Sequence, residues 1–160
     1  MRNVLTSIFV IVLFVACDSK QLFDEYQTVP GSWAKENAIS FTFKSPDTTN
    51  KYNLFINLRN NNEYPFSNLH IITELEDPKK NKITDTLEYI MANPDGSWLG
   101  TGFSAIKENK LWYKEKVRFK EKGNYLLTVK HAMRKNGNVL GLESLEGITD
   151  VGFRIEKTPQ

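Results

Sequence analysis

Short runs in which apolar and polar side chains alternate restrict the fold of this chain more than any other feature. A period of two places successive side chains on opposite faces of an extended strand, so each run predicts a half-buried β-strand. The runs span residues 39–43, 52–59, 68–75, 82–91, 111–119, 125–133 and 151–155. The alternation is least regular over 82–91, where Ile83, Leu87 and Tyr89 still share one face.

Residues typical of tight turns separate the predicted strands. Segment 77–81 suits a hairpin loop, segment 93–96 suits a type I turn, and glycine marks segments 122–124 and 136–137. No convincing amphipathic helix of ten or more residues occurs. The expected fold class is all-β, a single antiparallel β-sandwich of about eight strands. Its connections are either jelly-roll-like or immunoglobulin-like, which the pattern alone does not separate.

Length and charge limit the classes of protein to which the chain can belong. Its 160 residues suffice for one domain with a real core and leave little room for two. A formal net charge of +2 argues against a dedicated nucleic-acid binder, which usually has a strongly basic face. One cysteine excludes an internal disulfide framework and a cysteine zinc cluster, and two histidines make a protein-only metal site hard to build. We therefore predict no metal and no cofactor.

The N-terminus has the pattern of a secretory signal peptide. Arg2 precedes an apolar run over residues 8–16, which is shorter than the roughly 20 residues that cross a bilayer. Segment 14–17 (FVAC) resembles a lipobox, whose cysteine receives a diacylglyceryl group before cleavage, although Phe14 stands where leucine is usual. The alternatives are a plain signal peptide, or a buried apolar strand that ends in a cysteine by chance.

Lipidation at Cys17 predicts how the chain is organised. Residues 1–16 are then a lipoprotein signal peptide, residues 17–23 a short tether, and residues 24–157 the β-sandwich domain. Several acyl chains on one residue would hold the protein firmly on a membrane, because each buried CH₂ contributes about 0.8 kcal/mol. The chain would be anchored to the membrane without spanning it.

A long connection over residues 92–109 interrupts the rhythm of strands and turns. It contains three glycines together with Trp98 and Phe103. Loops of this length inside compact domains are often functional, which makes both aromatic residues candidates for a partner-binding surface. The alternative is a corner loop in which Trp98, Leu99 and Phe103 cover the open end of the sandwich.

Two predicted surfaces carry residue types that favour binding. The first is a basic row on one strand face, suited to an acidic protein patch or to lipid headgroups. The alternative is an exposed face charged for solubility and edge protection. The basic row consists of Trp112, Lys114, Lys116, Arg118 and Lys120. The second combines amides, a guanidinium and an aromatic ring, as glycan-binding faces and ordinary turns both do. It consists of Asn53, Asn57, Arg59 and Tyr64.

No set of residues points to catalysis. The usual general bases are limited to His70, on the polar face of its predicted strand, and His131, in line with Val129 and Met133. The sequence contains no phosphate-binding glycine loop, no HExxH and no GxSxG. We predict that the protein is not an enzyme, has no catalytic residue and has no small-molecule substrate.

Several segments, in the right order, resemble the gliding-motility lipoprotein family GldH. The likeness covers the chain from about Phe23 to Glu156, and the lipobox-like Cys17 fits the family as well. The segments are 52–69, 85–89, 96–102, 108–119, 131–134 and 145–156. The resemblance implies no catalytic residues.

The resemblance also implies a function and a location. We expect a non-enzymatic envelope lipoprotein that supports bacterial gliding motility and the associated type IX secretion machinery. Its partners would be the membrane, through lipid on Cys17, and other proteins of that machinery. The expected location is the outer membrane with the domain facing the periplasm, although the sequence does not decide between inner and outer membrane. The alternative function is a glycan- or peptidoglycan-binding periplasmic lipoprotein.

Overall fold

The computed structural model describes residues 21–159 and consists of β-strands joined by turns and loops. The predicted signal peptide, Cys17 and the first part of the predicted tether lie outside the described residues. In chain order the strands are β1 (Gln21–Thr28), β2 (Trp33–Ala34), β3 (Ile39–Lys44), β4 (Tyr52–Asn60), β5 (Asn68–Glu76), β6 (Lys82–Ile90), β7 (Lys107–Val117), β8 (Asn124–His131), β9 (Ser144–Leu145) and β10 (Ile148–Lys157).

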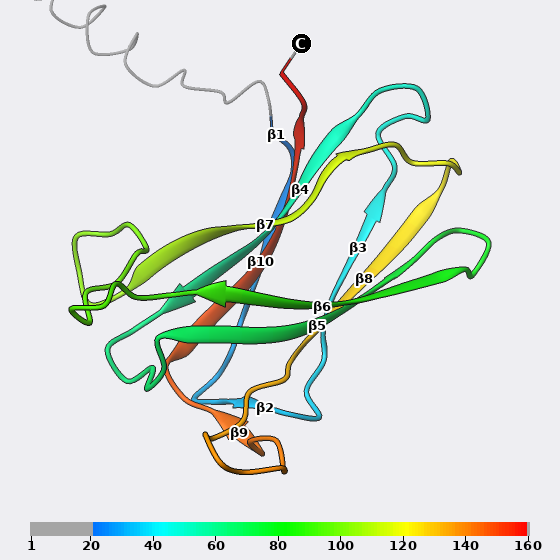
Figure 1. Ribbon diagram of the computed structural model, residues 1–160. Helices are drawn as coiled ribbons and strands as arrows, with labels where there is room; N and C mark the ends of the chain where they lie inside the picture. Colours follow the sequence, from blue (N-terminus) through cyan, green and yellow to red (C-terminus); the bar gives the residue numbers. More distant parts are fainter. Residues whose placement is uncertain (1–20, 160) are drawn as a thin grey trace, which may run out of the picture.

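The strands form two antiparallel four-stranded sheets that pack face to face, which confirms the predicted all-β sandwich (Figure 1). One sheet has the order β1-β10-β4-β7 and the other the order β3-β8-β5-β6. The short pair of β2 and β9 forms a separate ribbon. Apart from that pair, the strands are paired in nested fashion, the first with the last, the second with the second last, and so on inward. Nested pairing of this kind is jelly-roll order, which decides between the two alternatives that the sequence left open.

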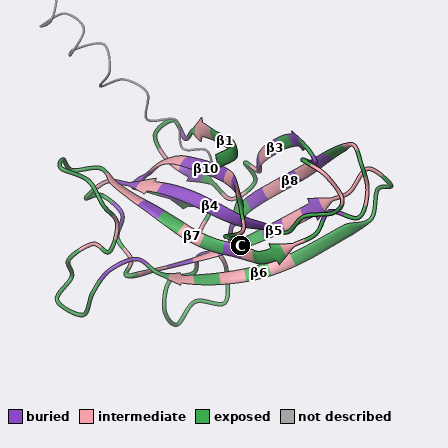
Figure 2. Cartoon of the chain, turned by 90° about the horizontal axis from the view of Figure 1, so that it is seen from above, coloured by how far each residue is buried: buried purple, intermediate pink, exposed green. Residues whose placement is uncertain are grey.

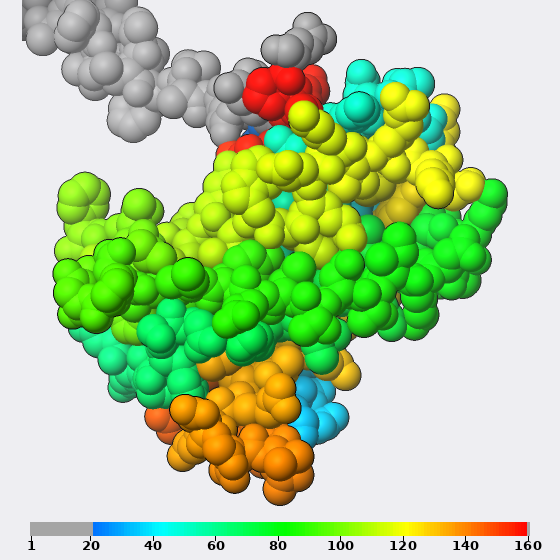
Figure 3. Space-filling model, viewed as in Figure 1, coloured from blue at the N-terminus to red at the C-terminus, as the bar shows by residue number. Residues whose placement is uncertain are grey.

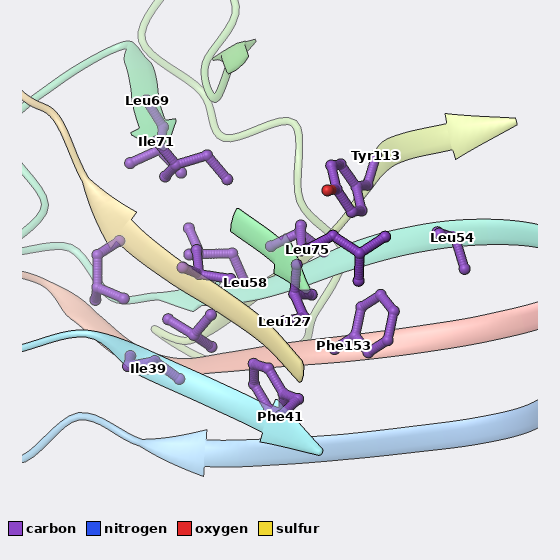
Figure 4. Close-up of a cluster of buried hydrophobic side chains, with 14 of the residues drawn as sticks. Ile39, Phe41, Leu54, Leu58, Leu69, Ile71, Leu75, Tyr113, Leu127 and Phe153 are labelled. Atoms are coloured by element: carbon purple, nitrogen blue, oxygen red, sulfur yellow. The ribbon is translucent and has the colours of Figure 1, made fainter. Parts of the chain in front are cut away.

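The core lies between the two sheets and is filled from both. Phe41 on β3, Leu58 on β4 and Phe153 on β10 are completely buried there (Figure 4). Strand β4 is unusual because almost all its residues are buried, on its outer face as well as toward the core (Figure 2). On that outer face the rings of Phe55 and Trp112 lie 4.4 Å apart.

The first and seventh strands differ from their sequence predictions. Strand β1 begins at Gln21, so residues 21–23 of the predicted tether belong to the sheet. Strand β7 begins at Lys107, inside the predicted loop, and ends at Val117, before the end of the predicted run. The backbone of Lys116 is in the left-handed region, with φ of 51°. A strand rarely continues through that conformation, which explains the early end of β7.

The antiparallel register separates the domain into two ends. At one end Gln21 pairs with Glu156, and at the other Thr28 pairs with Asp150. The terminal end, as we name it, holds Gln21 and four segments of the chain. These are the three turns 44–51, 76–82 and 115–124 and the C-terminal residues 157–159. The loop end, at the opposite side, holds the connections 92–106 and 134–143 (Figure 1).

Among the described residues there is no helix with the length and apolar character needed to cross a bilayer.

Candidate functional site

The connection over 92–106 at the loop end is folded by local hydrogen bonds. The Asp95 carboxylate accepts hydrogen bonds from the backbone and side chain of Ser97, and these bonds hold the pKa of Asp95 below its ordinary value. Further along, Thr101 and Glu108 form an antiparallel bridge through two backbone hydrogen bonds. Phe103, in the segment that this bridge closes, is fully exposed. The loop therefore presents an aromatic ring to solvent from a defined backbone.

The expectation that three apolar residues of this loop cover the sandwich end is correct for one of them. Trp98 packs against Tyr64, with 6.0 Å between ring centroids, and its indole N–H donates to the Asn62 side chain at 3.3 Å. Leu99 and Phe103 point outward instead, with about half of Leu99 exposed. Of the three residues, only Trp98 therefore packs against the core, where it contacts the buried Tyr64.

A second connection at the loop end also exposes apolar side chains. Val139 and Leu140, in the connection 134–143, are 89% and 80% exposed. Figure 3 shows this connection in orange at the bottom of the molecule and the tip of the 92–106 connection in light green at the left. The loop end thus carries two separate projections with apolar tips.

The predicted basic row is not one row in the structure. The Trp112 ring packs at an angle against Phe55, and Lys114 forms an ion pair with Asp85 on β6 at 2.7 Å, so both side chains have partners within the domain. Lys116 occupies the left-handed position near the end of β7. Two further cations, Arg118 and Lys120, lie beyond the strand, in the turn at the terminal end. The prediction of a single strand face was wrong because the strand stops at Val117.

The terminal end instead gathers cations from several turns of the chain. Arg118 and Lys120 meet there with the exposed Lys51 and Lys157, because β4 pairs with both β7 and β10. Two carboxylates of these turns, Asp47 and Asp77, accept hydrogen bonds that close them. Hydrogen bonds from the Tyr52 hydroxyl and from Asn50 hold the pKa of Asp47 well below its ordinary value.

The four residues of the predicted glycan-binding face do not share an exposed surface. Asn53, Asn57 and Tyr64 are buried. The Tyr64 hydroxyl donates to the backbone carbonyl of Asn68 at 2.6 Å, and burial raises the pKa of Tyr64 far above its ordinary value. Arg59 is bound through its Nε to Glu108 at 2.8 Å. These side chains therefore stabilise the domain, and they leave no common face for a sugar.

A polar network on the outer face of the first sheet was not predicted from the sequence. Arg154 on β10 contacts Asp24 on β1 at 2.9 Å and Glu156 at 2.5 Å, and Lys110 on β7 reaches Glu156 at 2.6 Å. Burial alone would raise the pKa of Glu156, but hydrogen bonds from Lys110 and Arg154 lower it. In the sequence, Arg154 and Glu156 alternate with apolar residues, which indicates only that both lie on the same outer face of a strand. Their partners come from strands distant in sequence, so spacing could not reveal the network.

The two histidines lie in different environments beside one groove on the second sheet. His70 is half-buried and lies 3.4 Å from Glu88, whereas His131 is buried against the Trp33 ring. Burial lowers the pKa of His131, and neither of its ring nitrogens has a hydrogen-bond partner among the described residues. The groove has a volume of about 480 Å³, a partly apolar floor that includes Ile72, and cations such as Lys130 at its edge. Glu36 and Thr86 also line the groove, but neither side chain forms a hydrogen bond with His70 or His131, so these residues do not form the linked nucleophile and base of a catalytic triad.

No cluster of three or more histidine, cysteine or acidic side chains that could hold a metal ion occurs among residues 21–159.

Comparisons with known proteins place the chain in the family that its sequence resembles. Over 156 residues it is 53% identical to the gliding motility lipoprotein GldH homolog of Christiangramia forsetii, covering 98% of this chain and 96% of that protein. Over 146 residues it is 53% identical to the gliding motility lipoprotein GldH of Flavobacterium johnsoniae, covering 91% of each chain. Among solved structures, the infectious bursal disease virus VP2 subviral particle matches at a TM-score of 0.35 and 14% identity, covering 88% of this chain and 34% of that one. The model of the GldH lipoprotein family matches residues 21–155, and the chain belongs to that family.

Proposed function

We propose that this protein is a non-enzymatic, lipid-anchored envelope component that supports gliding motility and the type IX secretion machinery. Membership of a lipoprotein family implies attachment to a membrane of the envelope. The relatives at 53% identity are named as gliding motility lipoproteins, which supports a role in the same process. Cys17 is the proposed site of lipidation. The proposed location is the outer membrane, with the domain facing the periplasm.

One observation carries the proposal that the protein works by binding another protein. Phe103 is fully exposed on a loop whose backbone is fixed on both sides, and Leu99 and Ile106 of the same loop are about half exposed. Burying an aromatic side chain in an interface removes on the order of 200 Å² of its surface from water. Aromatic residues on preformed surfaces are typical centres of protein interfaces. The 92–106 connection is therefore the proposed contact with a machinery component.

Affinity co-purification from gently solubilised native membranes tests this proposal. The tagged wild-type protein is expected to enrich other gliding or type IX secretion components, identified by mass spectrometry. Replacing Phe103 and Leu99 together by serine should lower that recovery roughly tenfold or more, because interface centres dominate affinity. The matched control replaces Ile83 and Leu22, which are also exposed apolar side chains but lie toward the terminal end, and should recover partners like the wild type.

The anchor is tested separately by the Cys17→Ala variant. It should appear in the soluble fraction, lack the mass of acyl chains and impair gliding. The wild-type protein could instead be recovered without any machinery component and bind purified peptidoglycan. That result would favour the glycan-binding alternative over the proposal. Normal gliding by cells that carry only Cys17→Ala would contradict the role of the anchor.

A further inference from the structure

The position of the first described strand limits how far the domain can lie from its proposed anchor. Three residues separate Cys17 from Gln21. Fully extended, this part of the chain spans about 14 Å at most. Gln21 lies at the terminal end, where it pairs with Glu156 near the C-terminus. If Cys17 carries lipid, the terminal end is the part of the domain closest to the membrane.

The terminal end is also the basic part of the molecule. Its four segments hold ten cationic and five acidic residues, a net charge of +5, whereas the whole chain sums to +2. The cations are Lys44, Lys51, Lys79, Lys80, Lys82, Lys116, Arg118, Lys120, Lys122 and Lys157. Residues 21–159 together sum to +1, so those outside the four segments sum to −4, and charge is divided along the axis of the domain.

Of the five acidic side chains at the terminal end, Asp47 and Asp77 close turns, Glu76 and Glu121 form ion pairs with lysines, and Glu115 is exposed. Asp77 accepts hydrogen bonds from the backbone N–H groups of Lys79 and Asn81 and closes its turn, as Asp47 does in the 44–51 turn. All ten cations are exposed. Within residues 21–159, seven of them form no ion pair: Lys44, Lys51, Lys116, Arg118, Lys120, Lys122 and Lys157.

We propose that the terminal end lies against the anionic phospholipid headgroups of the membrane that holds the lipid on Cys17. The proposal rests on the proposed lipidation. The short link keeps this end within reach of the surface potential, which extends about 8–10 Å at physiological salt. A basic residue near an anionic surface contributes roughly fivefold to binding. Strands of eight to eleven residues then place the loop end, with Phe103, on the order of 30 Å from the membrane, toward a partner.

Lysine acylation of the native lipidated protein in vesicles tests this orientation. The protein is purified from membranes and reconstituted into phosphatidylcholine vesicles with or without about one-third phosphatidylglycerol. Acylation rates are read at each lysine by mass spectrometry. Lys51 and Lys122 should react several-fold more slowly on the anionic vesicles, and about 0.5 M salt should remove the difference. Lys130 and Lys135, outside the terminal end, should react equally on both.

Two variants with the same change in net charge sharpen the test. Replacing Lys116, Arg118 and Lys120 by glutamine should abolish the protection of Lys51 and Lys122. The control replaces three exposed cations outside the terminal end, Lys130, Arg134 and Lys135, and should keep that protection. Equal acylation of Lys51 and Lys122 on both kinds of vesicle, or equal effects of the two variants, would overturn the orientation.

The intact mass of the purified protein separates this inference from the proposed anchor. A mass without acyl chains would remove the lipidation on which both rest. A lipidated protein without lipid-dependent protection would remove the orientation alone, and the anchor would stand.

Discussion

The two ends of this sandwich close the same core in different ways. At the terminal end, turns are closed by carboxylates such as Asp47 and Asp77, and the exposed side chains are mostly cationic. At the loop end, the connections are longer, and Phe103, Val139 and Leu140 are exposed. Core closure explains the buried residues at both ends, but it explains neither the excess of cations nor the exposed apolar tips. We propose that the cations face the membrane and that the exposed apolar tips contact a partner.

The loop end also contains a rigid part, and its disruption should have the largest effect on stability. Gly147 has φ of +78°, and a Cβ atom there would lie 2.1 Å from the Tyr64 nitrogen. Gly147→Ala should therefore lower the free energy of unfolding by about 3 kcal/mol or more, measured by urea denaturation. Gly137→Ala is the control, because its φ of +82° faces open space, and it should cost about 1–2 kcal/mol. Equal losses would show that the packing against Tyr64 is unimportant.

The carboxylates that close turns should contribute more to the stability of the protein at the terminal end than at the loop end. The pKa of Asp47 is lowered by hydrogen bonds from Tyr52 and Asn50, so its stabilisation is present above the unfolded pKa of about 3.9 and is lost as pH falls below it. Asp47→Asn should destabilise the protein at neutral pH and flatten the loss of stability on acidification. Denaturation at a series of pH values measures both effects. Asp95→Asn, in a loop-end turn with fewer such bonds, should have a smaller effect.

His131 should make the protein sensitive to mild acid near the loop end. Its pKa is lowered by burial, so the folded state binds a proton less readily than the unfolded state. Stability should be unaffected above the unfolded pKa of about 6.5 and should fall as pH decreases below it. His131→Phe should reduce that loss between about pH 6.5 and 5. The free energy of unfolding is measured by chemical denaturation at each pH. If it falls with pH in the variant as steeply as in the wild type, His131 does not cause the loss of stability.

The smallest effect on stability is expected at the tip of the 134–143 connection. Val139→Ser and Leu140→Ser together should change the free energy of unfolding by no more than about 0.5 kcal/mol, because both side chains are already in water. Thermal and urea unfolding measure the change. A larger loss would mean that these side chains pack against the domain, which would remove one of the two apolar projections from the comparison.

The sequence predicted the strands that alternate clearly and missed those that do not. Strands β3 to β6, β8 and β10 match the predicted runs to within a few residues. Strand β1 was partly assigned to a tether because it is an edge strand that buries none of its residues fully. The predicted basic row extended a regular period past Lys116, where the backbone turns left-handed. The alternation of side chains along the sequence does not predict that the backbone leaves the extended conformation at Lys116.

The sequence by itself determined the all-β class, the single domain and the family, because alternation and motif order are local properties of the chain. The tertiary structure decided the jelly-roll order and the neighbours of each side chain. It brought Arg118, Lys51 and Lys157 to the end that holds Gln21, and it placed Phe103 at the other. These placements depend on pairing between strands far apart in sequence. Alternation specifies which face of a strand is buried, but it does not specify which strand lies beside it.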